Sequence, residues 1–378
     1  MLLATLVLLT LFVAYANGAN DNFKGVATLY GSNTTTFDRA LLIGTIATLA
    51  GCVSSVFLAE ALVKAFSGKG LVPDALAASP AFLLAVAAGA SCTVMLATVL
   101  GFPISTTHAL TGALVGAGFA GAGTALNISL LGSAFFLPLL LSPLLSILLT
   151  MPLYKLAHAA SERSGLVKES CVCIGPKEFV PVRALAFDVS TASYSRPVEN
   201  GGLSVTIGTA SDCVQKYRGN VFGVTAQNVV DGVHHASGAA VSFARGLNDT
   251  PKIVGLLLVV QALDIRVSMF AVAIVMALGG LVHARKVAET MSKKISRMND
   301  GQALTANLVT AFTVIAASRY GLPVSTTHVS VGAITGIGII NRSGDASVIF
   351  SILLSWVLTL PIAAVIAGVV YWLARFAP

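Results

Sequence analysis

Charged residues are scarce in this sequence. Asp, Glu, Lys and Arg make up only 10% of its 378 residues, whereas 56% are hydrophobic. Soluble domains carry about 25% charged residues, and a soluble protein with so apolar a surface would expose large adhesive patches. The lack of charge therefore excludes an ordinary soluble domain and indicates an integral membrane protein.

The missing charge leaves long apolar runs, the longest of which lies between Asp74 and Lys155. Backbone polar groups in lipid must bond within their own segment, so we expect helices of about 20 residues per span. The alternation of polar and apolar residues that marks membrane β-barrels is not present. The other charge-free runs are Met1–Asn20, Ala40–Ala59, Val267–Ala284, Gly301–Ser318, Tyr320–Asn341 and Ala346–Ala374.

These runs predict an all-α polytopic membrane protein with about 10–12 membrane segments. The first run, Met1–Asn20, lacks the basic residues that begin a signal peptide. We therefore interpret it as a membrane segment that is retained.

The positive charges are concentrated in two loops. Of the residues behind the net charge of +7, Tyr154–Arg218 carries eight Lys or Arg and Arg285–Arg297 carries five. Positive loops of membrane proteins face the cytoplasm. The sequence thus predicts a multi-pass protein of the cell (inner or plasma) membrane, and the charge gives no indication of nucleic-acid binding.

Cysteine is also scarce. Cys52 and Cys92 lie in apolar runs, while Cys171, Cys173 and Cys213 lie in the central loop. A metal site would need a fourth ligand that is not evident. A loop disulfide or free thiols are therefore favoured over a metal centre.

Two motifs occur twice, in the same order. Gly101–Gly118 reads GFPISTTHALTGALVGAG and Gly321–Gly338 reads GLPVSTTHVSVGAITGIG, with ten identical positions of eighteen. Gly18–Lys24 reads GANDNFK and Gly246–Lys252 reads GLNDTPK. Chance does not explain this, so the chain is interpreted as a tandem duplication, an arrangement typical of secondary transporters.

The duplication predicts three parts. Residues 1–155 form a first membrane repeat and residues 220–378 a second, with broken or re-entrant helices. The repeats are expected to be inverted. Residues 156–219 form a cytoplasmic linker, in which the alternating stretch Leu203–Gly208 suggests a small hairpin.

The S-T-T-H motif is expected to start a helix inside the membrane. Pro103 and Pro323 suit a first helical turn, and Ser105 and Ser325 can cap it. A helix start attracts anions through its free N–H groups and partial positive charge. The hydroxyls of the two S-T-T segments would add donors around a tetrahedral oxyanion. The alternative is that these residues only cap and bridge helices, which the duplication of the motif makes less favoured.

Glycines follow each S-T-T-H motif at small-xxx-small spacing, which lets helices approach closely. They are Gly112, Gly116, Gly118, Gly332, Gly336 and Gly338.

The N-D motifs place carboxylates at membrane depth, where an ionised group is costly unless paired and is a functional candidate. An unwound Gly-Asn-Asp turn at Asp21 and at Asp249 would expose carbonyl, amide and carboxylate oxygens together. Such oxygens suit a hard cation such as Na⁺. Pro251 is expected to break the chain at the second motif.

Two pairs of residues beside these motifs keep alternative interpretations. Lys24 and Lys252 either pair with the Asp or touch the anion, or they snorkel to the interface. His108 and His328 make either a structural hydrogen bond or a substrate contact.

The G-x-N-D and G-x-P-[IV]-S-T-T-H motifs, each present once per half, resemble the inorganic phosphate transporter (PiT) family of Na⁺- or H⁺-coupled symporters. The resemblance implies inverted repeats, coupling cations beside the substrate and a homodimer. The phosphate-binding residues that it implies are Asp21, Ser105, Thr106, Thr107, Asn248, Ser325, Thr326 and Thr327. The Na⁺ ligands that it implies are Asn20, Asp21, Asn22, Asn248, Asp249, Ser105 and Ser325.

The sequence thus predicts a secondary transporter, not an enzyme, that imports inorganic phosphate by Na⁺ symport through alternating access. The alternative is a proton-coupled phosphate symporter or a sulfate symporter on the same scaffold. A hydrolase using Ser105 with His108 would need an orienting acid that is not evident. An anion channel is disfavoured because carboxylates at the site would repel anions.

Overall fold

The computed structural model describes residues 2–58, 60–164, 170–175, 204–209, 224–260, 263–295 and 298–376. Contacts divide the chain into two compact units, which are described separately. One combines Met1–Lys155 with His234–Pro378, and the other is Leu156–Val233.

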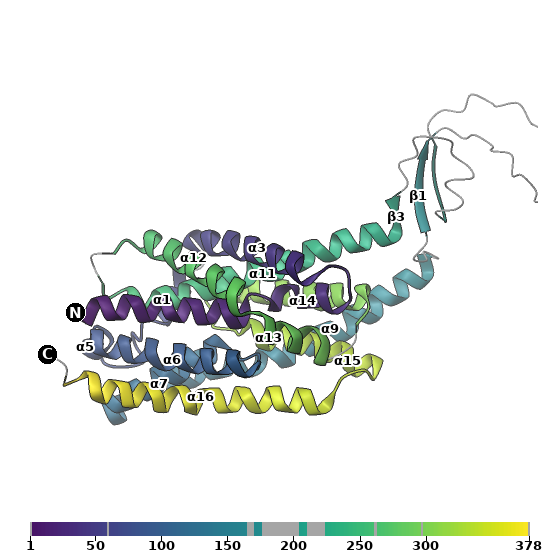
Figure 1. Cartoon of the computed structure of the whole chain (residues 1–378). Helices are drawn as coiled ribbons and strands as arrows, with labels where there is room; N and C mark the ends of the chain where they lie inside the picture. Colours follow the sequence, from purple (N-terminus) through teal and green to yellow (C-terminus); the bar gives the residue numbers. More distant parts are fainter. Residues whose placement is uncertain are drawn as a thin grey trace, which may run out of the picture. The chain divides into compact units, whose positions relative to one another are not determined.

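The larger unit is helical, as the lack of charge predicts (Figure 1). The helices of the first half are α1 (Leu2–Asp21), α2 (Ala27–Gly31), α3 (Phe37–Leu58), α4 (Glu60–Ala65), α5 (Asp74–Ala77), α6 (Pro80–Leu100), α7 (Thr106–Ala122), α8 (Ile128–Leu130) and α9 (Leu137–Ser164). Those of the second half are α11 (Ala226–Val254), α12 (Ile265–His283), α13 (Arg285–Glu289), α14 (Asp300–Arg319), α15 (Thr326–Asn341) and α16 (Ala346–Ala374). Short 3-10 or π segments lie at Lys24–Val26, Gly123–Ala125, Leu131–Phe136, Gly255–Leu257 and Thr290–Lys294.

Seven helical segments of the described chain are long and apolar enough to cross a membrane. They are Leu2–Gly31, Phe37–Leu58, Pro80–Leu100, Ile128–Ala160, Ile265–His283, Asp300–Arg319 and Ala346–Ala374. Helices α7, α11 and α15 pack among them and carry motif residues. The all-α polytopic fold predicted from the sequence is therefore confirmed.

The second N-D motif differs from the prediction. α11 runs without interruption through Asn248, Asp249 and Pro251 and ends only at Val254. The expected unwound turn and the break at Pro251 are wrong there. A proline is tolerated within a membrane helix when neighbouring groups replace the lost backbone bond, and this part of α11 is buried. In the first half, Gly18, Asn20 and Asp21 also lie within α1, which ends at Asp21, so the unwound turn expected at that motif is wrong too.

Glycines bring the two halves into direct backbone contact. A Cβ added at Gly18 of α1 would lie 1.8 Å from the Met276 carbonyl oxygen of α12. A Cβ added at Gly246 of α11 would lie 2.2 Å from the Thr48 carbonyl oxygen of α3. Each N-D helix therefore packs on a helix of the other half.

The glycines after the S-T-T-H motifs give a second pair of exchanged contacts. A Cβ at Gly116 of α7 would lie 1.9 Å from the carbonyl oxygen of Ala364 in α16. A Cβ at Gly336 of α15 would lie 3.3 Å from that of Ile147 in α9. The close helix approach predicted from small-residue spacing is confirmed, and again the partner belongs to the other half.

The segments that follow α7 and α15 lie toward opposite ends of the larger unit. After α7, the Asn127 amide donates to the Leu71 carbonyl, just before α5. After α15, the Asp345 amide donates to the Ile295 carbonyl, just after α13. In Figure 1, α5 lies at the end of this unit where both chain termini lie, and α13 lies toward the opposite end. The inverted relation of the two repeats stays a prediction, and the positions of these two helix ends agree with it.

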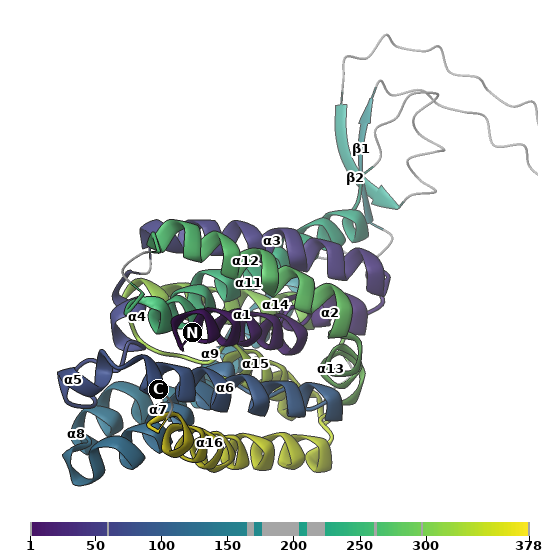
Figure 2. The ribbon, with the colours of Figure 1, turned by 60° about the vertical axis from the view of Figure 1, so that its left-hand side comes forward.

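The second unit contains a three-stranded antiparallel sheet in the order β2-β1-β3, and Figure 2 shows β1 beside β2. Its strands are β1 (Ser170–Gly175), β2 (Ser204–Thr209) and β3 (Val224–Thr225). Ser170 pairs with Thr209 and Cys171 with Thr225. The alternating stretch expected to form a hairpin overlaps β2, while Cys213 lies outside the described residues.

Candidate substrate site

Each S-T-T-H motif follows a short extended segment that turns back into the protein. Gly101 (φ 80°) ends α6 and Gly321 (φ 68°) follows the end of α14, both in the left-handed conformation that glycine adopts without strain. The Ser105 hydroxyl accepts from the His108 amide at 3.1 Å, and the Ser325 hydroxyl accepts from the His328 amide at 3.2 Å. The predicted capping serines are therefore confirmed.

The two extended segments bond to each other's helix starts. The Thr107 hydroxyl donates to the Val324 carbonyl at 3.3 Å, and the Thr327 hydroxyl donates to the Ile104 carbonyl at 2.9 Å. Thr107 and Thr327 occupy equivalent positions in the two halves. Ile104 and Val324 do as well, so the two bonds are the same contact with the halves exchanged. Such reciprocal pairing is the property of an approximate two-fold axis. The two hydroxyl-rich turns thus converge at one buried place.

The N-D motifs join this place through side chains. The Thr106 hydroxyl donates to Asp21 at 3.2 Å, and the Asn248 amide donates to the Val324 carbonyl at 3.2 Å. Asn20 accepts from the Ile104 amide at 3.2 Å. The predicted residues on α1, α7, α11 and α15 therefore form one buried polar cluster.

Lys24 lies at the centre of the first set of contacts, with only 2% of its surface exposed. Its Nζ donates to Asp21 Oδ1 at 2.5 Å and to Asn20 Oδ1 at 2.9 Å. It also reaches the Ile104 carbonyl and the Thr327 hydroxyl, both at 2.6 Å. The snorkelling interpretation of Lys24 is therefore wrong.

Lys252 makes the counterparts of three of these contacts and is 1% exposed. Its Nζ donates to the Thr107 hydroxyl at 2.7 Å and to the Val324 carbonyl at 2.8 Å. Its distance to Asp249 Oδ1 is 3.4 Å. Snorkelling is thus wrong for Lys252 as well, and each lysine links an N-D motif to the S-T-T segment of the opposite half.

Asn17 connects the two carboxylates, a role that the sequence analysis missed. Its Nδ2 lies 3.1 Å from Asp21 Oδ2, 3.1 Å from Asp249 Oδ2 and 3.0 Å from the Thr106 hydroxyl. Its Oδ1 accepts from Arg245 Nη1 at 3.4 Å. Asn17 and Arg245 each precede the glycine of an N-D motif, so extending the repeat by one residue would have found both.

Arg245 has hydrogen-bond donors that no described residue uses. Its side chain is 1% exposed, and its Nε and Nη2 have no partner among the described residues. The N–H bonds on this edge of the guanidinium are parallel and match two oxygens of a carboxylate or phosphate. Leaving such buried donors unsatisfied costs about 1–3 kcal/mol each, so an oxyanion would satisfy an existing deficit.

The cluster carries more positive than negative charge. Lys24, Lys252 and Arg245 are three cations, against the two carboxylates of Asp21 and Asp249, and all five side chains are buried. Buried charge must be paired. Binding of one monovalent anion would therefore balance the charge of this cluster.

Asn22 is not brought to the cluster. Its Nδ2 donates to the Thr45 hydroxyl of α3 at 2.8 Å, and its side chain packs against Gly280 of α12. Thr326 begins α15 as Thr106 begins α7, and it is 5% exposed. The other predicted residues of the phosphate and Na⁺ sites lie in or directly beside the cluster.

The two histidines meet each other rather than the carboxylates. Their ring centroids are 4.4 Å apart, and the His328 ring stacks on Trp356 at 3.8 Å. His328 Nδ1 also lies 3.2 Å from the Leu139 carbonyl oxygen. Because Ser105 bonds the His108 backbone rather than its ring, the geometry is not that of a serine nucleophile with a histidine base.

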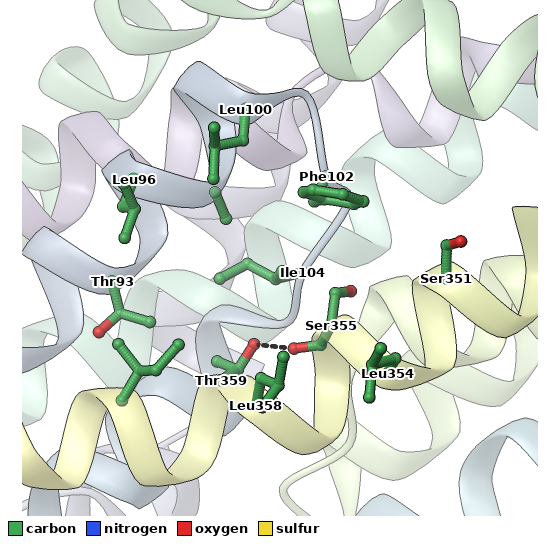
Figure 3. A pocket seen from close by; sticks show the side chains of 12 residues that line it. Thr93, Leu96, Leu100, Phe102, Ile104, Ser351, Leu354, Ser355, Leu358 and Thr359 are labelled. Carbon is green, nitrogen blue, oxygen red and sulfur yellow. Dashed lines mark hydrogen bonds between the residues drawn. The ribbon is translucent and has the colours of Figure 1, made fainter.

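An apolar pocket of about 270 Å³ lies beside the first extended segment (Figure 3). Its lining is mostly aliphatic, with Leu96, Phe102 and Leu358 among the residues. Ile104 lines this pocket, while its carbonyl bonds Lys24 and Thr327. The pocket lacks charged residues, so it is not the anion site.

Comparisons with known proteins agree with this geometry. Residues 17–367 match the model of the phosphate transporter family. A relative named "Putative phosphate permease" from Pyrococcus abyssi is 28% identical over 98% of this chain and 97% of its own length. Inorganic phosphate transporter 2-1, chloroplastic, of Arabidopsis thaliana is 25% identical over 96% of this chain and 70% of its own length.

The fold also resembles a solved structure described as the sodium-dependent phosphate transporter. The likeness covers 100% of both chains with a TM-score of 0.76 and 23% identity. At 23% sequence identity, this likeness supports the fold of the chain and nothing further. The family match covers most of the chain, including both N-D motifs and both S-T-T-H motifs, and the chain is therefore a multi-pass membrane protein of the phosphate transporter family.

Proposed function

We propose that this protein imports inorganic phosphate by cation symport, through alternating access to a site between its two halves. The observation that carries the proposal is the reciprocal bonding of the S-T-T segments, Thr107 to Val324 and Thr327 to Ile104. It places two helix starts and their hydroxyls around one buried point. Helix starts and hydroxyls are donors suited to an oxyanion.

Phosphate would be held by the residues predicted from the S-T-T and N-D motifs, with Arg245 in addition. The unpaired Nε–Nη2 edge of Arg245 would donate hydrogen bonds to two phosphate oxygens. Asp21 and Asp249 favour phosphate over sulfate, because phosphate can carry a proton near neutral pH and donate it to a carboxylate. Sulfate is the second candidate substrate, which a symporter on the same scaffold would carry.

Alternating access is supported by the way the site is built. The S-T-T and N-D side chains are at most 5% exposed and bond one another. Phosphate must therefore separate some of these bonds as it enters. A movement of one half against the other would open the cluster first to one side and then to the other, as in other transporters with duplicated halves.

The coupling cation that the sequence predicts is Na⁺, and protons are the alternative. Na⁺ coupling is supported by the solved neighbour, which is described as sodium-dependent. Proton coupling is supported by the buried carboxylates. The resemblance to PiT proteins also implies a homodimer in the cell membrane, which the mass of the purified protein would test.

Uptake of ³²P-phosphate into proteoliposomes tests the proposal. We expect saturable uptake that rises with an imposed cation or proton gradient and that excess unlabelled sulfate inhibits only weakly. Full competition by sulfate would assign the protein to the second substrate class. Absence of phosphate uptake under every gradient would reject the proposal.

A further inference from the structure

We infer that Lys24 and Lys252 are built-in cations that occupy the places of Na⁺ at the two N-D motifs, so phosphate binding does not require Na⁺. This inference rests on the proposed function, since it concerns the same site. It concerns which charges balance the anion, and it departs from the Na⁺ symport that the sequence predicts.

The first oxygen cage surrounds the Lys24 ammonium. Its four oxygens are a carboxylate, a side-chain amide, a backbone carbonyl and a hydroxyl, contributed by Asp21, Asn20, Ile104 and Thr327 at 2.5–2.9 Å. This is the set of hard ligands that a transported Na⁺ needs at a broken or terminating helix. Asn20 and Asp21, both predicted Na⁺ ligands, are thus bonded to a lysine of the same chain.

The second cage surrounds the Lys252 ammonium. The Thr107 hydroxyl and the Val324 carbonyl lie 2.7 and 2.8 Å from Nζ, and Asp249 Oδ1 lies at 3.4 Å. The Phe66 ring covers the ammonium with its centroid 5.9 Å from Nζ. Three of the four oxygen contacts of Lys24 have a counterpart at Lys252, with the halves exchanged, so the replacement is nearly symmetric.

The lysines are better explained as fixed cations than as phosphate ligands. An ammonium has three N–H donors. Lys24 already meets four protein oxygens and Lys252 meets three. Neither has a donor left for the anion, whereas Arg245 keeps two.

Charge balance gives the same result. With Lys24, Lys252 and Arg245 against two carboxylates, the buried cluster already has one positive charge in excess. A monovalent phosphate would neutralise it without any metal ion. Adding Na⁺ would place more positive charge beside buried ammonium groups, which is unfavourable at low dielectric.

Equilibrium binding of ³²P-phosphate to the purified full-length protein tests the inference. Binding is compared in sodium chloride and in choline chloride at equal ionic strength. We expect dissociation constants that agree within about twofold. Binding that requires Na⁺ would overturn the inference and leave the proposed function standing, whereas no binding in either salt would overturn the proposed function.

Removing the lysines should create a dependence on Na⁺. In the double variant Lys24→Ala/Lys252→Ala, the carboxylates lose their partners and the cages open. We expect phosphate binding in choline to weaken at least about tenfold and Na⁺ to restore much of it. Binding that is equally weak in both salts would contradict the inference, because the opened cages would then not accept Na⁺.

Thermal unfolding gives a readout that does not need phosphate. A ligand that binds the folded state raises the unfolding temperature, so Na⁺ should stabilise the double variant and not the unaltered protein. Lys155→Ala removes an exposed lysine of α9 and serves as the matched control, with no gain of Na⁺ response. If the double variant does not fold, the single variants and the salt comparison on the unaltered protein still decide the matter.

Discussion

At the scale of single residues, Arg245 stands out because it is buried, charged and only partly bonded. Nη1 contacts Asn17, while Nε and Nη2 have no partner among the described residues. A side chain in this state is under-satisfied until an anion arrives. Its neighbours Asp21 and Asp249 compensate the charge but do not supply the missing acceptors.

Arg245→Gln is therefore expected to weaken phosphate binding. The loss of a charge-assisted bidentate contact of about 1.5–3 kcal/mol corresponds to roughly a tenfold or greater rise in the phosphate Kd. Arg245→Lys keeps the positive charge but lacks the two parallel N–H donors. Its phosphate Kd should therefore lie between that of the unaltered protein and that of Arg245→Gln. Arg375→Gln, at an exposed arginine beyond α16, is the control. An unchanged Kd in Arg245→Gln would remove Arg245 from the site.

Thr107 and Thr327 allow the symmetry of the site to be tested. Each hydroxyl donates to the extended segment of the other half and accepts from a lysine. Thr107→Val and Thr327→Val each leave a buried carbonyl and ammonium with one partner fewer, at about 1–3 kcal/mol. We expect both variants to lower the rate of phosphate uptake by a similar factor. A large effect of only one would show that one half dominates binding.

At the scale of helices, the packing of α7 on α16 depends on the absence of a side chain at Gly116. A Cβ there would lie 1.9 Å from the Ala364 carbonyl oxygen, closer than any real contact. Gly116→Ala should force the helices apart and destabilise the protein by about 1–3 kcal/mol. The measurement is the midpoint of thermal unfolding in detergent.

Gly132→Ala is the matched control for Gly116→Ala. A Cβ at Gly132 meets nothing within 4 Å, so we expect the unfolding midpoint to stay nearly unchanged. Equal midpoints for both variants would contradict the close packing of α7 on α16.

At the scale of the whole molecule, the glycine-containing faces of helices in each half pack against helices of the other half. α1 packs on α12 and α7 on α16, while α11 packs on α3 and α15 on α9. We expect residues 1–164 expressed alone to be degraded, because these faces then lack partners. Co-expression with residues 226–378 as a separate chain should restore phosphate uptake in membrane vesicles. Stable accumulation of either half alone would contradict this packing between the halves.

The sequence predicts much of this architecture because its main signals are local and repeated. The apolar runs predict the spanning helices, and the doubled Pro-x-Ser-Thr-Thr segments predict the buried helix starts at Ser105 and Ser325. The helical conformation of Asn248 and Pro251 could not be predicted from the sequence, because burial of α11 outweighs the tendency of proline to break a helix. The sequence also left open whether Lys24 lies at the interface or in the core, because that depends on oxygens of the opposite half.

The lysines in the two cages have an electrical consequence. An ammonium attached to the backbone does not travel with its cargo, so a phosphate ion that moves alone carries its negative charge across the bilayer as a current. Inward movement against an inside-negative potential costs about 2.3 kcal/mol per charge for each 100 mV, which is roughly a fortyfold concentration ratio. Accumulation would then depend on the acidity outside the cell, because a co-migrating proton is the remaining way to cancel that current.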